Sequence, residues 1–365
     1  MNSNMLKVKG REYQLPIYLP DATRAVVRAL DSPDLKNVGI DGVVVNTYHL
    51  MTEPGVEVLK KFGGIKKFMN FDGLITSDSG GWQVYSLIHR NKNKGTITDD
   101  GVVFSIGGAK NQLFTPEKSI QVQFDIGADI IVCFDDFVDP KFSKEKTKEA
   151  MDRTILWAKK CRKEFDRLVE KNGMDEKNRP LLFSVIQGGN DKEERKYCAE
   201  KLLEIGFDGY GYGGYAIRDG KLDLELSKYI VDLIPEDKLS FALGVGRPSD
   251  IAALSEMGWD IFDCVLPTRD ARHKRLYTFT REPKTVEDLI DPDLHDFLYI
   301  RRRKHAGKNE PISKFCDCHT CQNFSLGYLH HLFDIGDFSA HRLATIHNLR
   351  VYSKVIEILR ASQNK

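Results

Sequence analysis

Short apolar runs recur along the chain, and each of them ends in glycine or polar residues. Eight runs have the length and composition of buried strands: 42–46, 74–77, 129–134, 181–186, 209–212, 240–243, 261–266 and 276–280. Between them lie charged stretches with a helical period, most clearly at 144–171, 193–205, 222–233 and 248–257. Strands that alternate with helices in this way predict an α/β fold of the (β/α)8 TIM-barrel type. An open, doubly wound sheet is the alternative, but no Gly-x-Gly-x-x-Gly fingerprint follows the first run.

Two further segments extend this pattern. Residues 6–19 alternate between apolar and polar side chains, which predicts a small antiparallel sheet that caps the barrel. Residues 88–115 are polar and contain glycine, so we expect an insertion after the second strand. We therefore expect residues 1–280 to form the barrel with this sheet and insertion. Residues 281–365 would form a C-terminal helical subdomain whose last helix packs on the barrel.

One acidic residue interrupts the seventh run. Asp263 stands in the otherwise apolar segment 261–266, where a carboxylate is costly unless it is paired or used. Pro267 ends the strand, and Arg269 and Arg272 follow at once. Guanidinium groups suit phosphate, so a carboxylate beside them indicates chemistry on a nucleotide. A structural ion pair between Asp263 and Arg269 is the alternative.

Composition limits the partners and the compartment. A net charge of +1 means that nucleic-acid binding needs local basic patches, and the run 301–305 is either such a patch or a solvated face. No apolar run is long enough to span a bilayer, and the first residues lack the apolar core of a signal peptide. Seven cysteines, an odd number, argue against a complete disulfide framework. We therefore expect a cytoplasmic protein without a membrane partner.

Three cysteines crowd together in Cys316-Asp-Cys318-His-Thr-Cys321. Zinc takes four ligands in a tetrahedron, and three cysteines with one histidine satisfy it. Ligands this close indicate one structural zinc ion per chain rather than a catalytic one, so the C-terminal subdomain would bind Zn²⁺. Spacing does not fix the fourth ligand. We choose His347, with His319 and His331 as alternatives.

Taken together, the motifs resemble one family, the tRNA-guanine transglycosylases, also called queuine tRNA-ribosyltransferases. The resemblance runs over nearly the whole chain. It rests on VNTYHLM from Val45, SDSGGWQ from Ser77, FDD from Phe134, IQGG from Ile186, LGVG from Leu243, FDCVLPTR from Phe262, and CDCHTC from Cys316 with TIHN from Thr345.

The resemblance implies a pentosyltransferase of queuosine tRNA modification. Such enzymes exchange guanine at the wobble position of tRNAs with a GUN anticodon for a free 7-deazaguanine base, either queuine or 7-aminomethyl-7-deazaguanine. The displacement follows the logic of a retaining glycosidase. By resemblance, Asp263 is the nucleophile that forms a covalent ribosyl-aspartate, and Asp78 is the general acid and base. A homodimer is also implied.

The resemblance assigns further residues by position. The substrate-binding set is Asp135, Gln187, Gly214, Trp82, Leu243, Ser79, Gly80 and Asn46. Within it, Asp135, Gln187 and the Gly214 amide would read the base, and Trp82 and Leu243 would sandwich it. The RNA-binding set is Arg269, Arg272, Lys274, Arg275, Arg301, Arg302 and Arg303.

Four positions depart from the usual bacterial pattern. Phe137 stands where a small cysteine is usual, Trp82 replaces Phe or Tyr, and Lys274 replaces glycine. Arg218-Asp219 replaces a Gly-Glu pair whose glutamate helps to accept the aminomethyl base. The hypothesis is that the incoming base differs from 7-aminomethyl-7-deazaguanine, with queuine as the first candidate.

Other interpretations remain open. The chain could insert a 7-deazaguanine into DNA, or be the non-catalytic partner subunit of a heterodimeric transglycosylase, or be an unrelated barrel hydrolase. Single residues also have structural explanations. Asp78 could be a helix N-cap, Asp135-Asp136 a structural or metal pair, Gln187 a buried amide and Trp82 a core residue.

Overall fold

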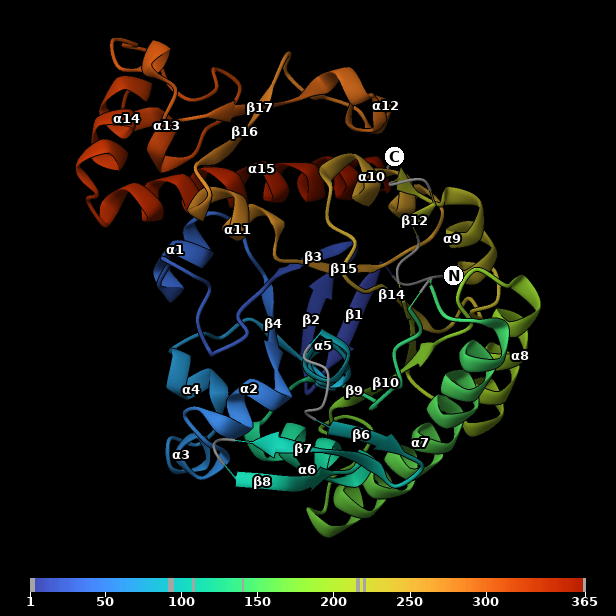
Figure 1. Ribbon diagram of the computed structural model, residues 1–365. Helices are drawn as coiled ribbons and strands as arrows, with labels where there is room; N and C mark the ends of the chain where they lie inside the picture. Colours follow the sequence, from blue (N-terminus) through green and yellow to red (C-terminus); the bar gives the residue numbers. More distant parts are fainter. Residues whose placement is uncertain are drawn as a thin grey trace.

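The computed structural model describes residues 4–90, 95–106, 109–139, 141–214, 217–218 and 221–363. A parallel eight-stranded sheet stands at its centre (Figure 1). In order around the sheet, its strands are β3 (Ile17–Pro20), β15 (Ile261–Cys264), β14 (Leu239–Ala242), β11 (Gly209–Tyr212), β10 (Leu181–Ile186), β9 (Ile130–Val132), β5 (Leu74–Asp78) and β4 (Gly42–Asn46). A parallel bridge between Asp21 and Val44 joins the first of these strands to the last. The fold is therefore the predicted TIM barrel.

The eighth strand differs from the prediction. β16 (Arg275–Phe279), at the predicted run 276–280, pairs antiparallel with β17 (His295–Tyr299) outside the barrel. The segment 265–274 before it is shorter than the dozen or more residues that a parallel crossover takes. β3, which we expected within the antiparallel sheet of 6–19, fills the place, parallel to β15. All four of its residues are buried, as in a strand covered on both faces.

The rest of the N-terminal segment caps the barrel as predicted. β1 (Met5–Val8) and β2 (Arg11–Gln14) form an antiparallel hairpin. Leu6 and Val8 of this hairpin belong to the apolar cluster that fills the barrel. The Lys9 ammonium group donates to the carbonyl of Ala128 over 2.7 Å, just before β9 begins. The hairpin therefore closes the amino-terminal end and leaves the carboxyl-terminal end for a site.

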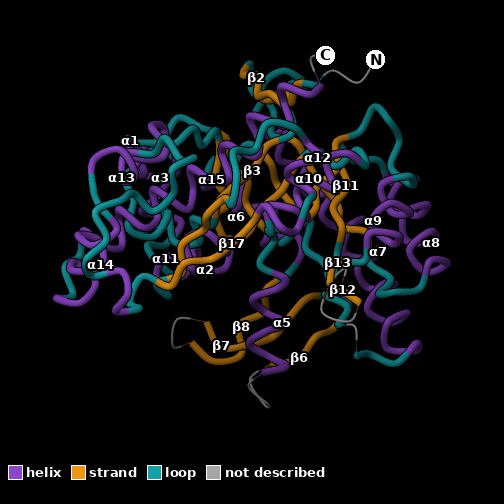
Figure 2. The backbone as a smooth tube through the Cα atoms, turned by 90° about the horizontal axis from the view of Figure 1, so that it is seen from above, coloured by secondary structure: helices purple, strands orange, loops and turns teal. Residues whose placement is uncertain are grey.

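Helices surround the barrel (Figure 2), and further helices belong to the C-terminal part of the chain (Figure 1). They are α1 (Ser32–Asn37), α2 (Thr47–Thr52), α3 (Val56–Lys61), α4 (Ile65–Met69), α5 (Gly81–Arg90), α6 (Pro116–Ile126), α7 (Lys144–Lys171), α8 (Lys192–Ile205), α9 (Leu224–Val231), α10 (Pro248–Glu256), α11 (Leu266–Arg272), α12 (Val286–Ile290), α13 (His319–Asn323), α14 (Leu326–Ile335) and α15 (Ser339–Gln363). No helix in the described part of the chain combines the length and apolar character that a membrane crossing requires.

Smaller sheets fall between these elements. The predicted insertion contains a three-stranded antiparallel sheet of β6 (Gly95–Thr98), β7 (Gly101–Ile106) and β8 (Ala109–Phe114). A short hairpin of β12 (Ile217–Arg218) and β13 (Lys221–Leu222) follows β11.

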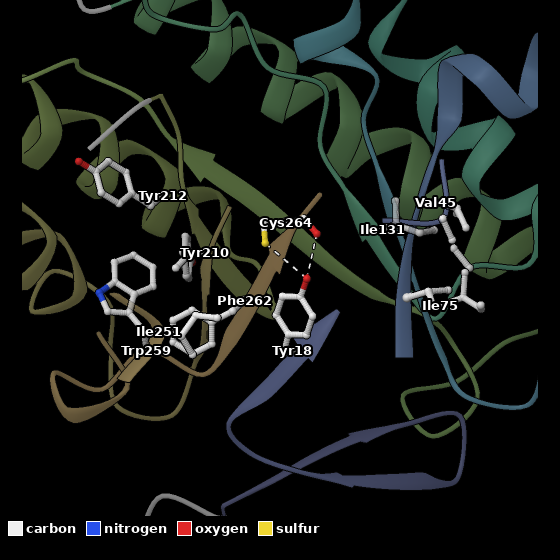
Figure 3. Close-up of a cluster of buried hydrophobic side chains, with 14 of the residues drawn as sticks. Tyr18, Val45, Ile75, Ile131, Tyr210, Tyr212, Ile251, Trp259, Phe262 and Cys264 are labelled. Atoms are coloured by element: carbon white, nitrogen blue, oxygen red, sulfur yellow. Dashed lines mark hydrogen bonds between the residues drawn. The ribbon is translucent and has the colours of Figure 1, made fainter. Parts of the chain in front are cut away.

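The long helix α15 ties the C-terminal elements to the barrel. It lies between β16 and the barrel in Figure 1. The Tyr352 hydroxyl on α15 donates to the carbonyl of Gly246, and the Asn348 amide donates to the carbonyl of Pro267 over 3.0 Å. On the barrel side, the Tyr18 hydroxyl of β3 donates to the carbonyl of Cys264 over 2.9 Å (Figure 3). These bonds fix the end of β15, which carries Asp263.

Candidate active site and metal centre

Asp78 is the last residue of β5, at the carboxyl end of the barrel. Both of its oxygens accept from the Asn46 amide over 2.8 Å, and the Gly80 amide donates to one of them over 3.0 Å. Burial raises the pKa of Asp78 to about 7, against the lowering effect of these hydrogen bonds, and the charge of Asp263 adds to the rise. Asn46 also caps α2, since its side-chain oxygen accepts from the His49 amide. Asn46 is 1% exposed. Its hydrogen bonds therefore fix the position of the Asp78 carboxyl group.

Asp263 lies near the carboxyl end of β15, which β3 and β4 separate from β5 around the barrel. One of its oxygens accepts from the Gly244 amide over 2.8 Å. Burial raises the pKa of Asp263 to about 7, and the charge of Asp21 adds to the rise. The alternative ion pair with Arg269 is absent from the described residues, where Arg269 is exposed. A carboxylate without a cation at the end of a buried strand is poised for chemistry rather than for stability.

Asp135 and Gln187, which follow β9 and β10, meet at the same end of the barrel. The Gln187 amide donates to Asp135 over 2.8 Å, and the Ser79 hydroxyl donates to the other oxygen of Asp135 over 3.2 Å. Burial raises the pKa of Asp135 to about 6, so its carboxyl group is ionised at neutral pH. Ionised, it accepts hydrogen bonds and cannot donate them. This suits the N–H donors on the edge of a guanine.

The alternative for the Asp135-Asp136 pair was a structural role, and Asp136 has one. Its carboxyl group accepts from the Arg153 guanidinium of α7 over 2.5 Å, and its own amide donates to the Thr154 hydroxyl. Adjacent residues therefore point to opposite sides: Asp135 toward Gln187, and Asp136 toward the surrounding helix.

Two glycines leave room beside these groups. A Cβ atom at Gly213 would lie 2.5 Å from the Gln187 amide nitrogen, and one at Gly81 would lie 2.8 Å from Asp135. Gly214 has a φ of +81°, which favours glycine. Larger residues at these positions would displace the carboxylate–amide pair.

The two aromatic departures touch each other. The rings of Trp82 and Phe137 are 4.8 Å apart between centroids and meet edge to face. Leu243 directly follows β14, and a Cβ atom on Gly211 of the adjacent strand β11 would lie 2.8 Å from its side chain. Asp219 and the side chain of Arg218, the other departure in this region, lie outside the described residues.

Basic residues from the expected RNA-binding set fall into two groups. Arg275 is committed to the fold, because it pairs with Asp270 over 2.7 Å and lies over the Phe297 ring. Arg272 is half-buried, and its Nη1 atom has no hydrogen-bond partner among the described residues. Burial and the charges of Arg28 and Arg269 lower the pKa of Arg272. Arg28, Arg269 and Arg272 thus form a positive cluster beside β3 and β15, with no ion pair among the described residues, which we call the arginine cluster.

The remaining basic residues lie farther along the chain. Arg301 lies 3.8 Å from Asp334, Arg302 stacks over Tyr299, and Arg303 is exposed. Lys274 follows α11 with a φ of +66°, in the left-handed region where glycine is favoured. Lys274 therefore adopts a backbone conformation that suits glycine, the usual residue at this position, better than lysine.

Two residues near the site were missed in the sequence. Asp21 directly follows β3, and its place in the barrel was hidden by the assignment of 6–19 to an antiparallel sheet. Arg195 looked like one of many surface charges on a helix, but it is fully buried and donates to the carbonyl groups of Ile186 and Gly189, on either side of Gln187. Its guanidinium group also lies 4.8 Å from the Tyr212 ring centroid. No local pattern distinguishes such an arginine from its exposed neighbours.

The metal centre lies in the C-terminal part. The ligand atoms of Cys316, Cys318, Cys321 and His347 all lie within 4.8 Å of one another. The His347 Nδ1 atom is 3.3 Å from the Cys321 sulfur, and Nε2 donates to the carbonyl of Tyr277 over 2.7 Å. This bond leaves Nδ1 free to ligate a metal. The two alternatives, His319 and His331, are exposed and outside the cluster. The donor set fits one tetrahedral metal ion.

Comparisons with known proteins point to one family over almost the full length of this chain. A family model described as queuine tRNA-ribosyltransferase matches residues 4–364. A queuine tRNA-ribosyltransferase from Caldanaerobacter subterraneus subsp. tengcongensis is 39% identical over 95% of this chain and 86% of its own length. Proteins of the same name from Mannheimia succiniciproducens and Haemophilus influenzae are each 37% identical, over 96% and 95% of this chain and 86% and 84% of their own lengths. The chain therefore belongs to the queuine tRNA-ribosyltransferase family.

Proposed function

We propose that this chain is a tRNA-guanine transglycosylase that replaces guanine at the wobble position of tRNAs with GUN anticodons by a 7-deazaguanine base. The observation that carries the proposal is a pair of carboxyl groups, Asp78 and Asp263, that form no ion pair within the described part of the chain and share the barrel rim with the Asp135–Gln187 pair. The first two are suited to displacement at a sugar carbon, and the second two to holding a guanine edge.

The proposed displacement has two halves. The Asp263 carboxylate attacks C1′ of the ribose, the bond from C1′ to guanine breaks, and Asp78 gives its proton to the leaving base. The incoming base then returns a proton to Asp78 and attacks C1′, which releases Asp263. Asn46 and Gly80 hold Asp78 in place, and Gly244 holds Asp263.

The protonation state fits this sequence of steps. Both carboxyl groups have a pKa of about 7, raised mainly by burial, and the charge of Asp263 also raises the pKa of Asp78. Two such groups favour holding one proton between them near neutral pH. The reaction needs this state, with one carboxyl group ionised and the other protonated. We therefore expect exchange activity to peak near neutral pH and to fall on both sides.

For the incoming base, we propose queuine rather than 7-aminomethyl-7-deazaguanine. The Trp82–Phe137 contact replaces smaller side chains and gives the pocket an aromatic wall. Such a wall offers apolar contact to the ring of a bulky substituent, which the smaller aminomethyl group lacks. In a competition assay, insertion of the aminomethyl base far faster than queuine would contradict this choice.

The metal is proposed to be one zinc ion, held by Cys316, Cys318, Cys321 and His347. It would cross-link the segment 316–321, which includes the start of α13, to α15 and take no part in the reaction. We expect about one zinc per chain by elemental analysis. The Cys318→Ser variant should lose zinc and unfold at a lower temperature. A homodimer and a cytoplasmic location, expected from the resemblance, stay predictions.

The test of the function is the exchange of labelled guanine into a tRNA with a GUN anticodon, with duplex DNA as a parallel substrate. We expect label in the tRNA, and none with the Asp263→Asn variant. Label in DNA alone would favour the DNA-modifying alternative. No label in either, from folded and zinc-loaded protein, would favour the partner subunit.

A further inference from the structure

Asp21 occupies a place on the barrel rim that no step of the proposed reaction uses. It directly follows β3, which lies between β15 and β4 in the barrel. Leu19 pairs with Asp263 and faces the apolar interior of the barrel. Because successive side chains of a strand alternate, Asp21 lies on the same inner face, one layer nearer to the carboxyl end. The parallel bridge between Asp21 and Val44 continues this register across the closure of the barrel.

The Asp21 carboxyl group keeps one oxygen available. Its Oδ1 atom accepts from the amide of Thr23 over 3.2 Å and also from the Thr23 hydroxyl. Among the described residues, none donates to Oδ2 and none forms an ion pair with Asp21. The group is half-buried, so a donor supplied by a ligand would meet an acceptor that water only partly satisfies.

The pKa values of neighbouring groups also indicate that Asp21 lies close to the proposed reacting groups. Its negative charge raises the pKa values of both Asp78 and Asp263, although burial is the larger cause for each. It also opposes the lowering of the pKa of Arg272 by burial and neighbouring arginines. Asp21 thus lies close to both proposed catalytic carboxyl groups and to the arginine cluster.

The barrel order indicates which part of a nucleotide would face Asp21, given the proposed function. The base-holding groups belong to the β9 and β10 side, through Asp135 and Gln187. The arginine cluster, which suits phosphates, lies on the β3 and β15 side. The sugar joins base and phosphate, so it would lie between them, with C1′ at Asp263. The ribose would therefore face β3.

Chemistry then limits the donor. A carboxylate repels phosphate, so it must meet an N–H or O–H group of the nucleotide. The donors of the base point to the other side of the barrel. In a nucleotide inside an RNA strand, the 3′ and 5′ oxygens are esterified, which leaves the 2′-hydroxyl as the sugar donor. This hydroxyl is also the group that distinguishes RNA from DNA.

We propose that Asp21 accepts a hydrogen bond from the 2′-hydroxyl of the reacting nucleotide and so makes the enzyme selective for RNA over DNA. The proposal rests on the transglycosylase function. The 2′-carbon adjoins C1′, so this bond strengthens as positive charge develops on the sugar in the transition state, as hydrogen bonds to the 2-hydroxyl do in glycosidases. Asp21 would therefore affect kcat as well as KM.

The experiment compares two RNA stem-loops that differ at one atom. One carries guanosine at the reactive position, and the other carries 2′-deoxyguanosine there, in an otherwise identical RNA. The kcat/KM of guanine exchange is measured on both for the wild type and for Asp21→Asn, which keeps the size of the side chain but replaces an acceptor oxygen by an amide. We expect the wild type to prefer the ribose substrate by about 10- to 100-fold, the effect of a hydrogen bond to a charged group.

The variant should lose most of this preference. Asp21→Asn is expected to lose about 10- to 100-fold on the ribose substrate and little on the deoxy substrate. Glu53→Gln is the matched control, because Glu53 is an exposed acid on the same rim that pairs with Arg24 over 3.5 Å. It removes the same charge and should leave the preference unchanged.

Three results would overturn the inference. Equal losses on both substrates would mean that Asp21 acts through the pKa values of Asp78 and Asp263 or through folding, and not through the hydroxyl. A wild type without ribose preference would have the same consequence. A wild type that exchanges guanine in neither substrate would refute the proposed function, and this inference would fall with it, whereas the first two results leave the function intact.

Discussion

Asp129 at the amino end of the barrel and the two acids Asp78 and Asp263 at the carboxyl end have opposite surroundings. At the amino end, Asp129 pairs with Lys66 over 2.6 Å and with Lys9 over 3.6 Å, and it accepts from the Ile75 amide. At the carboxyl end, no lysine or arginine of the described residues pairs with Asp78 or Asp263, and the charge of Asp21 increases the repulsion. The amino end is built for stability. The surroundings of Asp78 and Asp263 instead fit the reaction that we propose.

The largest expected contrast comes from the same substitution at the two ends. Asp263→Asn removes the proposed nucleophile, and we expect guanine exchange to fall at least about a thousandfold. Asp129→Asn should leave kcat within about twofold, because it lies at the opposite end and touches no proposed reacting group. Steady-state exchange kinetics on one tRNA measure both. Similar losses in the two variants would show that the ends are not functionally distinct.

Stability should show the reverse order. Asp129→Asn leaves two lysines without their partner, and we expect the free energy of unfolding to fall by about 2–3 kcal/mol. This loss is at or below the low end of the losses found when one partner of a buried ion pair is removed. The reason is that both lysine side chains are partly exposed. Urea unfolding measures the change. An Asp263→Asn variant that lost as much under the same conditions would contradict the comparison.

The effect of pH sharpens the comparison further. Burial raises the pKa of Asp78 to about 7, whereas the unfolded chain has the ordinary value near 4. The folded state therefore holds the proton more tightly, and this contribution to stability is complete below about pH 4 and is lost as pH rises to about 7. Asp78→Asn carries no such charge. We expect the free energy of unfolding of the variant, relative to wild type, to rise by about 1–2 kcal/mol between pH 5 and pH 8.

Urea unfolding at several pH values tests this expectation. Asp129→Asn is the control, and its difference from wild type should not shift in favour of the variant over the same range. A relative stability of Asp78→Asn that stayed constant from pH 5 to pH 8 would mean that Asp78 titrates as an ordinary exposed carboxyl group.

The smallest expected effect concerns a cation at the carboxyl end. Lys274 has a left-handed backbone, and Lys274→Gly should raise the free energy of unfolding by about 1 kcal/mol by relieving it. If the side chain grips RNA, the same variant should raise KM for tRNA by a few fold and leave kcat unchanged. Arg303→Gly, at an exposed position of the basic run, is a comparison without left-handed strain and should not gain stability.

Most of the barrel could be predicted from the sequence because its strands are short, continuous apolar runs. The run 42–46 and the helix 144–171 coincide with β4 and α7. The sequence could not show that β3, and not β16, is the remaining strand of the barrel, because an isolated four-residue strand does not reveal its partner. Asp263 stood out as an acid inside an apolar run, and the resemblance assigned Asp78. Arg195 did not stand out, since its burial depends on two loops that meet in space.

The contact between Trp82 and Phe137 was likewise invisible in the sequence. Each residue alone looked like a substitution of one pocket wall, and only the barrel brings the end of β5 next to the end of β9. The residue types indicated which chemistry to expect. The packing of the barrel determined which side chains lie together in one site.

The position of Trp82 gives the protein an internal optical probe. The chain has three tryptophans, and two of them, Trp157 and Trp259, are only 1% exposed in the packing around the barrel. Trp82 is half-buried at the proposed base pocket, against Phe137. A base that enters there would change the fluorescence of Trp82, while the other two emit a constant background. The affinity for guanine, queuine or any analogue can thus be read from the emission of the unlabelled protein, before any RNA is added.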